Sequence, residues 1–488
     1  MQRNLALPIC LLLVAGCAPS PVRLGPEMRL NPGGYSDLPS QHNEIVLAAC
    51  QERVYVVWQR LTEDADTADL VAQASADGAR SWLPEEVRLD EDAPDRSVSA
   101  MASLRCAGDD AYVAWWRRDL QGEPGDAPPP PGKRKGDKAI LVRRSGDGGR
   151  SWTPAVAVNT GFDAFIPSLA LDGEGGVYVA YDDERTSAHS IWFNRSAEGG
   201  RSWLPQDVEI DKPFGIRGRG QSALEVRLVA LPGGRVHAAW QDKDMGWSRP
   251  YYRGSEDRGA TWQEAVTDLK IGDSVFAWPP ELGADAEGRV YVVHGAVEGD
   301  RKSDIYFAAS YDNGKSWTLP PARLDEGEPF QSDSARHALA HDGRGALCVV
   351  WEESAWGEPN IVARRSGDAG RSWGPVVRLD GGTAGLSESH YPQIAADGQG
   401  GLAVVWEDMR ENILRVYANV STDGGQSWLP EALPVSGPGP ETGGSLRPKV
   451  TAVGPGRFLV AWMDTRFLPE RAQGLDVYAR VVELRKGR

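Results

Sequence analysis

Aromatic, basic and acidic side chains gather in segments of this sequence that are expected to form loops. Aromatic rings can stack on the apolar faces of sugars, and paired carboxylates can act as general acid and base in glycoside hydrolysis. These segments therefore have the side chains needed to bind or cleave glycans. The residues are Asp242, Asp244, Trp247, Arg249, Glu298, Asp300, Arg301, Arg336, His337, Glu352, Trp356, His390, Tyr391 and Arg447.

A short string that recurs seven times indicates the scaffold that would position these loops. It reads SADGARSW at 75, SGDGGRSW at 145, SAEGGRSW at 196, SEDRGATW at 255, SYDNGKSW at 310, SGDAGRSW at 366 and STDGGQSW at 421. Seven copies cannot all be active sites, so the string marks a repeated structural unit. Its fifth position is Gly in every copy except Ala79, and Gly permits the positive φ of a tight turn. The acids of the string are predicted to accept hydrogen bonds within the turn: Asp77, Asp147, Glu198, Asp257, Asp312, Asp368 and Asp423.

Residues 163–210 contain one complete unit. FIPSLAL, VYVAY, SIWFNRS and VEI are predicted to be four strands joined by Gly-rich turns, and a meander of about 50 residues is typical of a propeller blade. The second strand recurs eight times, once more than the turn string. The orphan segment PEMRLN at 26–31 is similar to fourth strands such as PEEVRLD at 84. We therefore predict an all-β, eight-bladed β-propeller of four-stranded antiparallel blades. Segment 26–31 would close the ring against residues 446–484, with six or seven blades as the alternatives.

The string S-x-D-x-G-x-[ST]-W resembles the Asp box, or BNR repeat, of the sialidase superfamily, and the resemblance covers nearly the whole mature chain. It implies a β-propeller, but it specifies activity much less, because one fold can support many functions. Sialidases hold the substrate carboxylate with three arginines, whose guanidinium groups bind it as bidentate forks. They use a Tyr/Glu pair and an Asp for the chemistry.

The unit at 163–210 matches the sialidase layout only in part. Its D-x-R motif lies at 183–185, but Phe165 stands where the resemblance expects the first arginine, and the following loop TSAHS has no acid. Later units offer HYP and LRP near the corresponding place. D-x-R also recurs at 408–410 and 464–466, which favours a structural ion pair over substrate binding. The candidate catalytic residues that the resemblance implies are Arg185, Arg336, Arg447, Tyr391 and Asp183.

Three functions remain open from the sequence. The incomplete sialidase set favours a surface-anchored propeller that binds glycans or proteins without hydrolysing sialosides. The alternatives are an active exo-α-sialidase or related glycoside hydrolase, and an envelope scaffold protein. No metal-site motif occurs, the Asp-Gly turns at 172 and 397 are interpreted as hairpin turns rather than calcium sites, and no cofactor is expected. The ligand-binding candidates are Trp247, Arg249, Trp356, His337 and His390.

The N-terminus and the net charge indicate where the protein acts. A net charge of −16 over 488 residues disfavours a nucleic-acid partner. Arg3 and the short apolar run that follows it are typical of a signal peptide, and VAGC resembles a bacterial lipobox with Cys17 as the lipidated residue. An ordinary secretory signal is the alternative. We predict a signal peptide at 1–17, a tether at 18–25 and a monomeric propeller at 26–488, anchored by lipid in the periplasm or on the cell surface, with the outer membrane favoured.

Three cysteines follow the predicted lipobox. Cys50 and Cys106 occupy equivalent places in successive units, so a disulfide between them is possible, whereas Cys348 has no counterpart. We predict instead that all three are buried small apolar residues. Residues 121–138, which are rich in proline and charge, are predicted to be a flexible loop.

Overall fold

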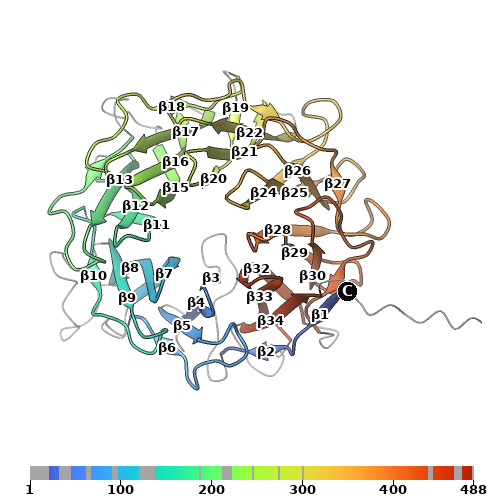
Figure 1. The fold of residues 1–488 in the computed structure, drawn as a ribbon, viewed down its shortest axis with the longest axis horizontal. Helices are drawn as coiled ribbons and strands as arrows, with labels where there is room; N and C mark the ends of the chain where they lie inside the picture. Colours follow the sequence, from blue (N-terminus) through green and yellow to red (C-terminus); the bar gives the residue numbers. More distant parts are fainter. Residues whose placement is uncertain are drawn as a thin grey trace, which may run out of the picture.

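A computed structural model describes residues 21–31, 45–61, 67–90, 97–119, 138–161, 163–185, 188–211, 222–244, 247–272, 275–298, 302–437, 443–466 and 475–485. All regular secondary structure in these ranges is β-strand, and the sheets follow one another around a ring (Figure 1). None of these residues belongs to a helix that could span a membrane. The all-β architecture and the antiparallel repeat predicted from the sequence are confirmed. Cys17 and most of the loop at 121–138 lie outside the described residues.

The repeat is a meander of four antiparallel strands. In the unit at 163–210, β11 pairs with β12, β12 with β13, and β13 with β14, as the sequence predicted. The first strands of the units, nearest the centre of the ring, are β3 (Val46–Cys50), β7 (Ser97–Ala107), β11 (Ala164–Leu171), β15 (Ser222–Leu231), β20 (Glu281–Ala284), β24 (Ser334–His341), β28 (Ser389–Ala396) and β32 (Ser445–Gly454). Each unit is named below by its first strand.

The second strands are β4 (Arg53–Leu61), β8 (Asp110–Asp119), β12 (Val177–Asp183), β16 (Arg235–Asp244), β21 (Val290–Glu298), β25 (Leu347–Glu353), β29 (Leu402–Asp408) and β33 (Arg457–Asp464). The third strands are β5 (Ala68–Ser75), β9 (Lys138–Ser145), β13 (Ser190–Ser196), β17 (Trp247–Ser255), β22 (Ser303–Ser310), β26 (Asn360–Ser366), β30 (Arg415–Ser421) and β34 (Asp476–Leu484). The short fourth strands are β6 (Val87–Arg88), β10 (Val156–Ala157), β14 (Val208–Glu209), β18 (Thr267–Asp268), β23 (Ala322–Arg323), β27 (Val377–Arg378) and β31 (Leu433–Pro434). A further strand, β19 (Val275–Ala277), joins β17 to β21.

The apolar core lies between neighbouring units. Six tryptophans at one repeated position of the second strands are less than 2 % exposed: Trp58, Trp115, Trp240, Trp351, Trp406 and Trp462. The buried clusters combine side chains from adjacent units, as where Tyr178 of β12 packs with Leu228 of β15 and Trp240 of β16. Burying one large apolar side chain stabilises the fold by about 1.5–3 kcal/mol, so contacts between the sheets hold the ring together.

The two ends of the chain meet in one sheet. β2 (Met28–Arg29) pairs with the C-terminal strand β34, and β1 (Val22–Leu24) pairs further along the same strand (Figure 1). The expected pairing of segment 26–31 with the C-terminal strands is therefore present. The predicted tether at 18–25 is wrong for residues 22–24, because Val22 is 7 % exposed and packs in the core against Val482.

The seven repeated strings form turns between third and fourth strands, on the face opposite the entries of the first strands. In the copy at 366–373, Ser366 Oγ donates to Asp368 Oδ1 at 2.8 Å, and the Ser372 backbone N–H donates to the same oxygen at 2.8 Å. Hydrogen bonds, led by that from the Ser372 hydroxyl, lower the pKa of Asp368 to about 2. The fifth residue has positive φ in every copy, including 64° at Ala79. These acids bond within their own turns, as the prediction required.

The cysteine prediction is wrong for two of the three residues. Cys50 and Cys106 form a disulfide, because adjacent first strands bring their Cα atoms to 5.9 Å. The bond covalently links the β3 and β7 units. Cys348 is a free, buried thiol, as predicted.

Candidate functional site

Three candidate residues lie at one repeated distortion of the first strands. In β24, β28 and β32 the pairing with the second strand shifts register near the start of the strand. The bulged residues have positive φ, 48° at Arg336, 55° at Tyr391 and 51° at Arg447. A bulge redirects side chains away from the regular alternation of a strand. The same bulge recurs at Met101, Ile166 and Glu225 in β7, β11 and β15, so the bulge belongs to the repeat and the identity of the bulged residues distinguishes the three later units.

The bulges bring these three side chains together from three consecutive units. The guanidinium carbon of Arg447 lies over the Tyr391 ring, 3.6 Å from its centroid, and that of Arg336 lies 4.4 Å from the same centroid. A guanidinium over an aromatic ring is attracted by the ring quadrupole. The Arg336 side chain remains 44 % exposed, whereas that of Arg447 is 13 % exposed. Tyr391 therefore has two cationic neighbours, one of them open to solvent.

Glu352, at the end of β25, fixes this arrangement. Its Oε2 accepts a hydrogen bond from Arg336 Nη1 at 2.7 Å and lies 3.1 Å from His390 Nδ1. Its Oε1 accepts the backbone N–H of Tyr391 at 2.7 Å. The Glu352 side chain is 4 % exposed, so the carboxylate serves its three partners rather than solvent. The hydrogen bond to Glu352 raises the pKa of His390 and favours the protonated imidazole, although burial opposes this.

Glu407 occupies the same place one unit later, at the end of β29. Its Oε1 accepts the backbone N–H of Arg447. Burial raises the pKa of its carboxyl group, and the nearby Arg447 offsets this only in part. Glu407 was not among the residues predicted from the sequence, although VVWEE and VVWED place a glutamate directly after the buried tryptophan in both units. The site thus contains two arginines, two buried glutamates and His390, whose pKa is raised.

The candidates of the β11 unit lie elsewhere and have their own partners. Arg185 Nη2 donates to Asp183 Oδ2 at 2.8 Å and to Asp207 Oδ2 at 2.9 Å. Its guanidinium carbon lies 3.8 Å from the Trp192 ring centroid. Arg410 pairs with Asp408 in the same way. The recurring D-x-R motif therefore braces the end of the second strand, and the structure does not bring Arg185 or Asp183 to the Tyr391 cluster.

Phe165 occupies the position at which the sialidase resemblance predicts the first arginine. Phe165 lies beneath Lys138, whose Nζ is 3.5 Å from the ring centroid. His189, in the loop after Arg185, lies 3.1 Å through Nδ1 from the buried Asp182. This hydrogen bond raises the pKa of His189. The β11 unit thus carries an imidazole–carboxylate pair that was not predicted from the sequence.

The remaining ligand-binding candidates are scattered around the ring. Trp247 and Trp356 are 39 % and 48 % exposed, and the missed Trp278 is 43 % exposed. Arg249 lies 3.5 Å from Asp268. His337 follows Arg336 but lies outside the cluster, and burial lowers its pKa. Of the loop residues named above, Asp300 and Arg301 lie outside the described residues.

Comparison with known proteins yields only distant structural likeness. No family model matches the chain, and no curated protein sequence matches it. A solved polysaccharide lyase of family PL25, an ulvan lyase, is 10 % identical, with 93 % of this chain and 95 % of that chain covered and a TM-score of 0.49. A protein of unknown function from Dyadobacter fermentans is 14 % identical, with 80 % and 96 % covered and a TM-score of 0.44. The Hadza microbial sialidase Hz136 is 15 % identical, with 70 % and 73 % covered and a TM-score of 0.37.

Proposed function

We propose that this protein is a surface-anchored, sialidase-like β-propeller that binds acidic glycans without hydrolysing sialosides. The carrying observation is the pair of guanidinium groups beside Tyr391, one of them exposed, in a chain whose net charge is −16. A guanidinium group binds a carboxylate or sulfate through two parallel hydrogen bonds. An exposed arginine next to an aromatic ring suits a sugar that carries such a group.

Binding is favoured over hydrolysis because Glu352 is already engaged. Most retaining or inverting glycosidases need two carboxyl groups facing the scissile bond, whereas sialidases use a tyrosine nucleophile together with the glutamate and the aspartate named above. Glu352 contacts Arg336, His390 and the Tyr391 backbone instead. The alternative of an active exo-α-sialidase or related hydrolase has one observation in its favour: the raised pKa of Glu407 is a property of a general acid. An envelope scaffold is the second alternative.

The test combines a glycan array with hydrolysis assays on fluorogenic sialosides and a panel of other glycosides. We expect binding to acidic glycans that is lost in Arg336→Gln and Arg447→Gln, and no turnover of sialosides. Arg150→Gln is the matched control, because Arg150 is an exposed arginine of a turn string on the opposite face. Robust turnover that disappears in the Arg336 or Arg447 variant would establish the hydrolase instead. A stable protein partner without glycan binding would establish the scaffold.

We further propose eight blades, closed by the N-terminal strand. Support comes from the pairing of β2 with β34 and from a buried cluster that contains Leu30, Val54 of β4 and Leu459 of β33. In such a ring, every sheet buries both faces against neighbours.

Anchoring through a lipid on Cys17 is part of the same proposal. The disulfide between Cys50 and Cys106 supports export, because such bonds persist mainly in oxidising compartments. Cys17→Ser should change both the mass of the protein and its detergent partitioning, because the lipid is no longer attached. An unchanged mass and unchanged partitioning would show that the protein is not a lipoprotein.

A further inference from the structure

Three of the turn strings pack against an aromatic side chain of the preceding unit. In the β11, β15 and β20 units, the third strand carries Phe193, Tyr252 and Phe307 at one repeated position. Their ring centroids lie 5.1, 4.6 and 5.0 Å from the string tryptophan of the next unit, with edge-to-face or steeply inclined rings. A Cβ added at the string glycine of that next unit would lie 2.5, 1.9 and 2.2 Å from the nearest atoms of these side chains, the second being the Tyr252 hydroxyl oxygen. The aromatic side chain therefore packs directly against the string glycine and leaves no room there for a methyl group.

The second strands supply another aromatic or imidazole side chain beside this one. The repeated position holds Tyr178, His237 and Tyr291 in the same three units. In the β3 unit, the third-strand residue is the small Ala72, and there the second-strand Tyr55 contacts the next tryptophan at 6.5 Å. At least one of the two positions is thus aromatic in these units.

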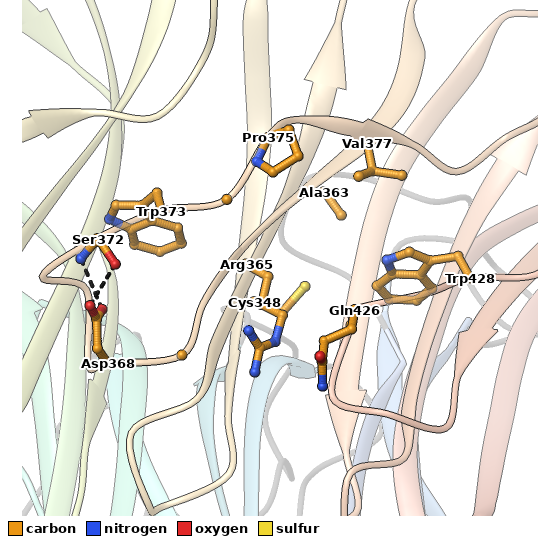
Figure 2. Close-up of a pocket in the computed structure, with 13 residues that line it drawn as sticks. Cys348, Ala363, Arg365, Asp368, Ser372, Trp373, Pro375, Val377, Gln426 and Trp428 are labelled. Carbon is orange, nitrogen blue, oxygen red and sulfur yellow. Dashed lines mark hydrogen bonds between the residues drawn. The ribbon is translucent and has the colours of Figure 1, made fainter.

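The β24 unit lacks an aromatic side chain at both positions, as do the β28 unit, with Ala403 and Ala418, and the β32 unit, with Leu459 and Ala479. The third strand of the β24 unit carries Ala363 and its second strand carries Cys348. As a result, a pocket of about 500 Å³ opens between the β24 unit and the turn string of the β28 unit (Figure 2). Its volume is within the range of sites for small ligands, about 300–1,000 Å³. The pocket lies on the opposite face of the ring from the Tyr391 cluster.

The groups that line this pocket include two tryptophans, Arg365, Gln426 and the carboxylate of Asp368, which is hydrogen-bonded to Ser366 and Ser372 of its own turn. Trp373 and Trp428 stand on opposite sides, and Arg365 and Gln426 lie between them (Figure 2). Within the described ranges, no aromatic ring contacts Trp428, unlike the string tryptophan of the preceding unit. Arg365 donates through Nε to the Gly424 carbonyl at 2.7 Å. Across the part of the chain that the structure describes, its guanidinium has no carboxylate partner.

We propose that this pocket binds one pyranose residue of an acidic glycan, at a site separate from the Tyr391 cluster. The apolar face of the sugar ring would lie against Trp428. The carboxylate or sulfate of the sugar would pair with Arg365, and the Gln426 amide would bond the hydroxyl groups. A neutral sugar leaves Arg365 unpaired, and a purely aromatic ligand leaves the Gln426 amide without a partner.

The test follows the indole N–H signal of Trp428 in ¹⁵N-tryptophan-labelled protein, assigned with Trp428→Phe. The probes are D-glucuronate, D-glucose and benzoate. We expect D-glucuronate to shift this signal and to bind more tightly than D-glucose. Arg365→Gln should weaken D-glucuronate binding about tenfold, the effect of a lost hydrogen bond to a charged group, and leave D-glucose binding unchanged. Ala363→Phe restores the ring found in the preceding unit and should abolish the response to both sugars.

The melting temperature shows whether each variant is folded. Ala363→Phe should melt no lower than the unmodified protein, because the new ring fills an existing pocket. If the phenylalanine of Ala363→Phe disturbs folding, the comparison between Arg365→Gln and the unmodified protein decides the test. The proposal is overturned if no probe shifts the Trp428 signal, if benzoate alone does so, or if folded Ala363→Phe binds D-glucuronate as the unmodified protein does. Arg336→Gln should leave this response unchanged, so failure of the opposite site and failure of this pocket are distinguishable.

Discussion

Replacing Leu30 by alanine tests whether the N-terminal strand closes the ring. Leu30 is 2 % exposed and packs in one cluster with Ile45 of the first unit and Val477 of the C-terminal strand. Its backbone N–H donates to the Val477 carbonyl at 2.8 Å. The substitution keeps this backbone bond and removes only the side chain that lies between the two ends of the chain.

The expected loss can be estimated from burial. A buried Leu→Ala change costs about 2–5 kcal/mol, depending on how far the site collapses, and we take about 3 kcal/mol. The entropy of unfolding is about 2.1 cal/mol/K per residue, which gives about 1 kcal/mol/K for a chain of 488 residues. If the ring unfolds as one cooperative unit, Leu30→Ala should therefore lower Tm by about 3 °C.

Differential scanning calorimetry on the mature protein measures this shift. Leu386→Ala is the control, because Leu386 is 76 % exposed and surface changes usually stay within about 0.5 kcal/mol. Glu27→Ala provides a second probe: Glu27 accepts the Gly437 backbone N–H at 2.7 Å and pairs with Arg466. Deleting residues 18–31 should lower Tm further than Leu30→Ala does. If the deletion and both substitutions melt like the unmodified protein, the strand does not close the ring, and the proposed blade count loses its support.

Three other predictions concern groups inside the ring. Burial lowers the pKa of His237 to about 4 and that of His294 to about 3, from an unfolded value of 6.5. Both residues take up protons in the unfolded chain first, so stability should fall by several kcal/mol as pH drops from about 6.5 towards 4. In denaturant titrations across this range, His237→Phe should flatten the pH dependence, and an equally steep curve would contradict the assignment. Reducing the bond between Cys50 and Cys106, 56 residues apart, should cost about 2–4 kcal/mol; an unchanged Tm in dithiothreitol, with free thiols confirmed, would count against this. Arg185→Gln leaves two buried carboxylates without their cation and should cost about 3–5 kcal/mol, whereas a loss of ligand binding at unchanged Tm would indicate a binding role instead.

The repeat itself was predictable from the sequence because its determinants are local. The strand pattern of residues 163–210 corresponds closely to β11, β12, β13 and β14, and the positive φ at the fifth position of each turn string follows from the glycine placed there. The extra second strand and the orphan segment at 26–31 predicted the pairing of β2 with β34. These inferences needed only the spacing of apolar residues and turns.

The disulfide and the site depend on distances between units, which spacing within a unit does not give. Cys50 and Cys106 are 56 residues apart, and their bond requires the first strands of two units to be adjacent. Arg336, Tyr391 and Arg447 were named as separate candidates. Their meeting depends on three bulges, each of which redirects one side chain towards its neighbours. No bulge could be inferred from sequence alternation, because the extra residue interrupts that alternation.

Positions whose side chains differ from those at equivalent positions in other units indicate function better than the repeated positions do. A position that faces the same neighbours in every unit is expected to hold similar side chains, because the packing requirement is the same. Truncating a buried aromatic ring costs about 3–5 kcal/mol of stability. Phe307 and Tyr291 pack in the core of the preceding unit, whereas the smaller Ala363 and Cys348 stand at the same positions in the β24 unit and stabilise it less. The first-strand bulge itself belongs to the repeat, because Met101, Ile166 and Glu225 have positive φ at the same register shift in β7, β11 and β15. The departure in the three later units is that the bulged residues are Arg336, Tyr391 and Arg447, which meet in one cluster. Both departures involve the β24 unit and its neighbours, on opposite faces of the ring. Stability alone does not account for either, which is the physical reason to look for ligands at these two places rather than at the regular interfaces.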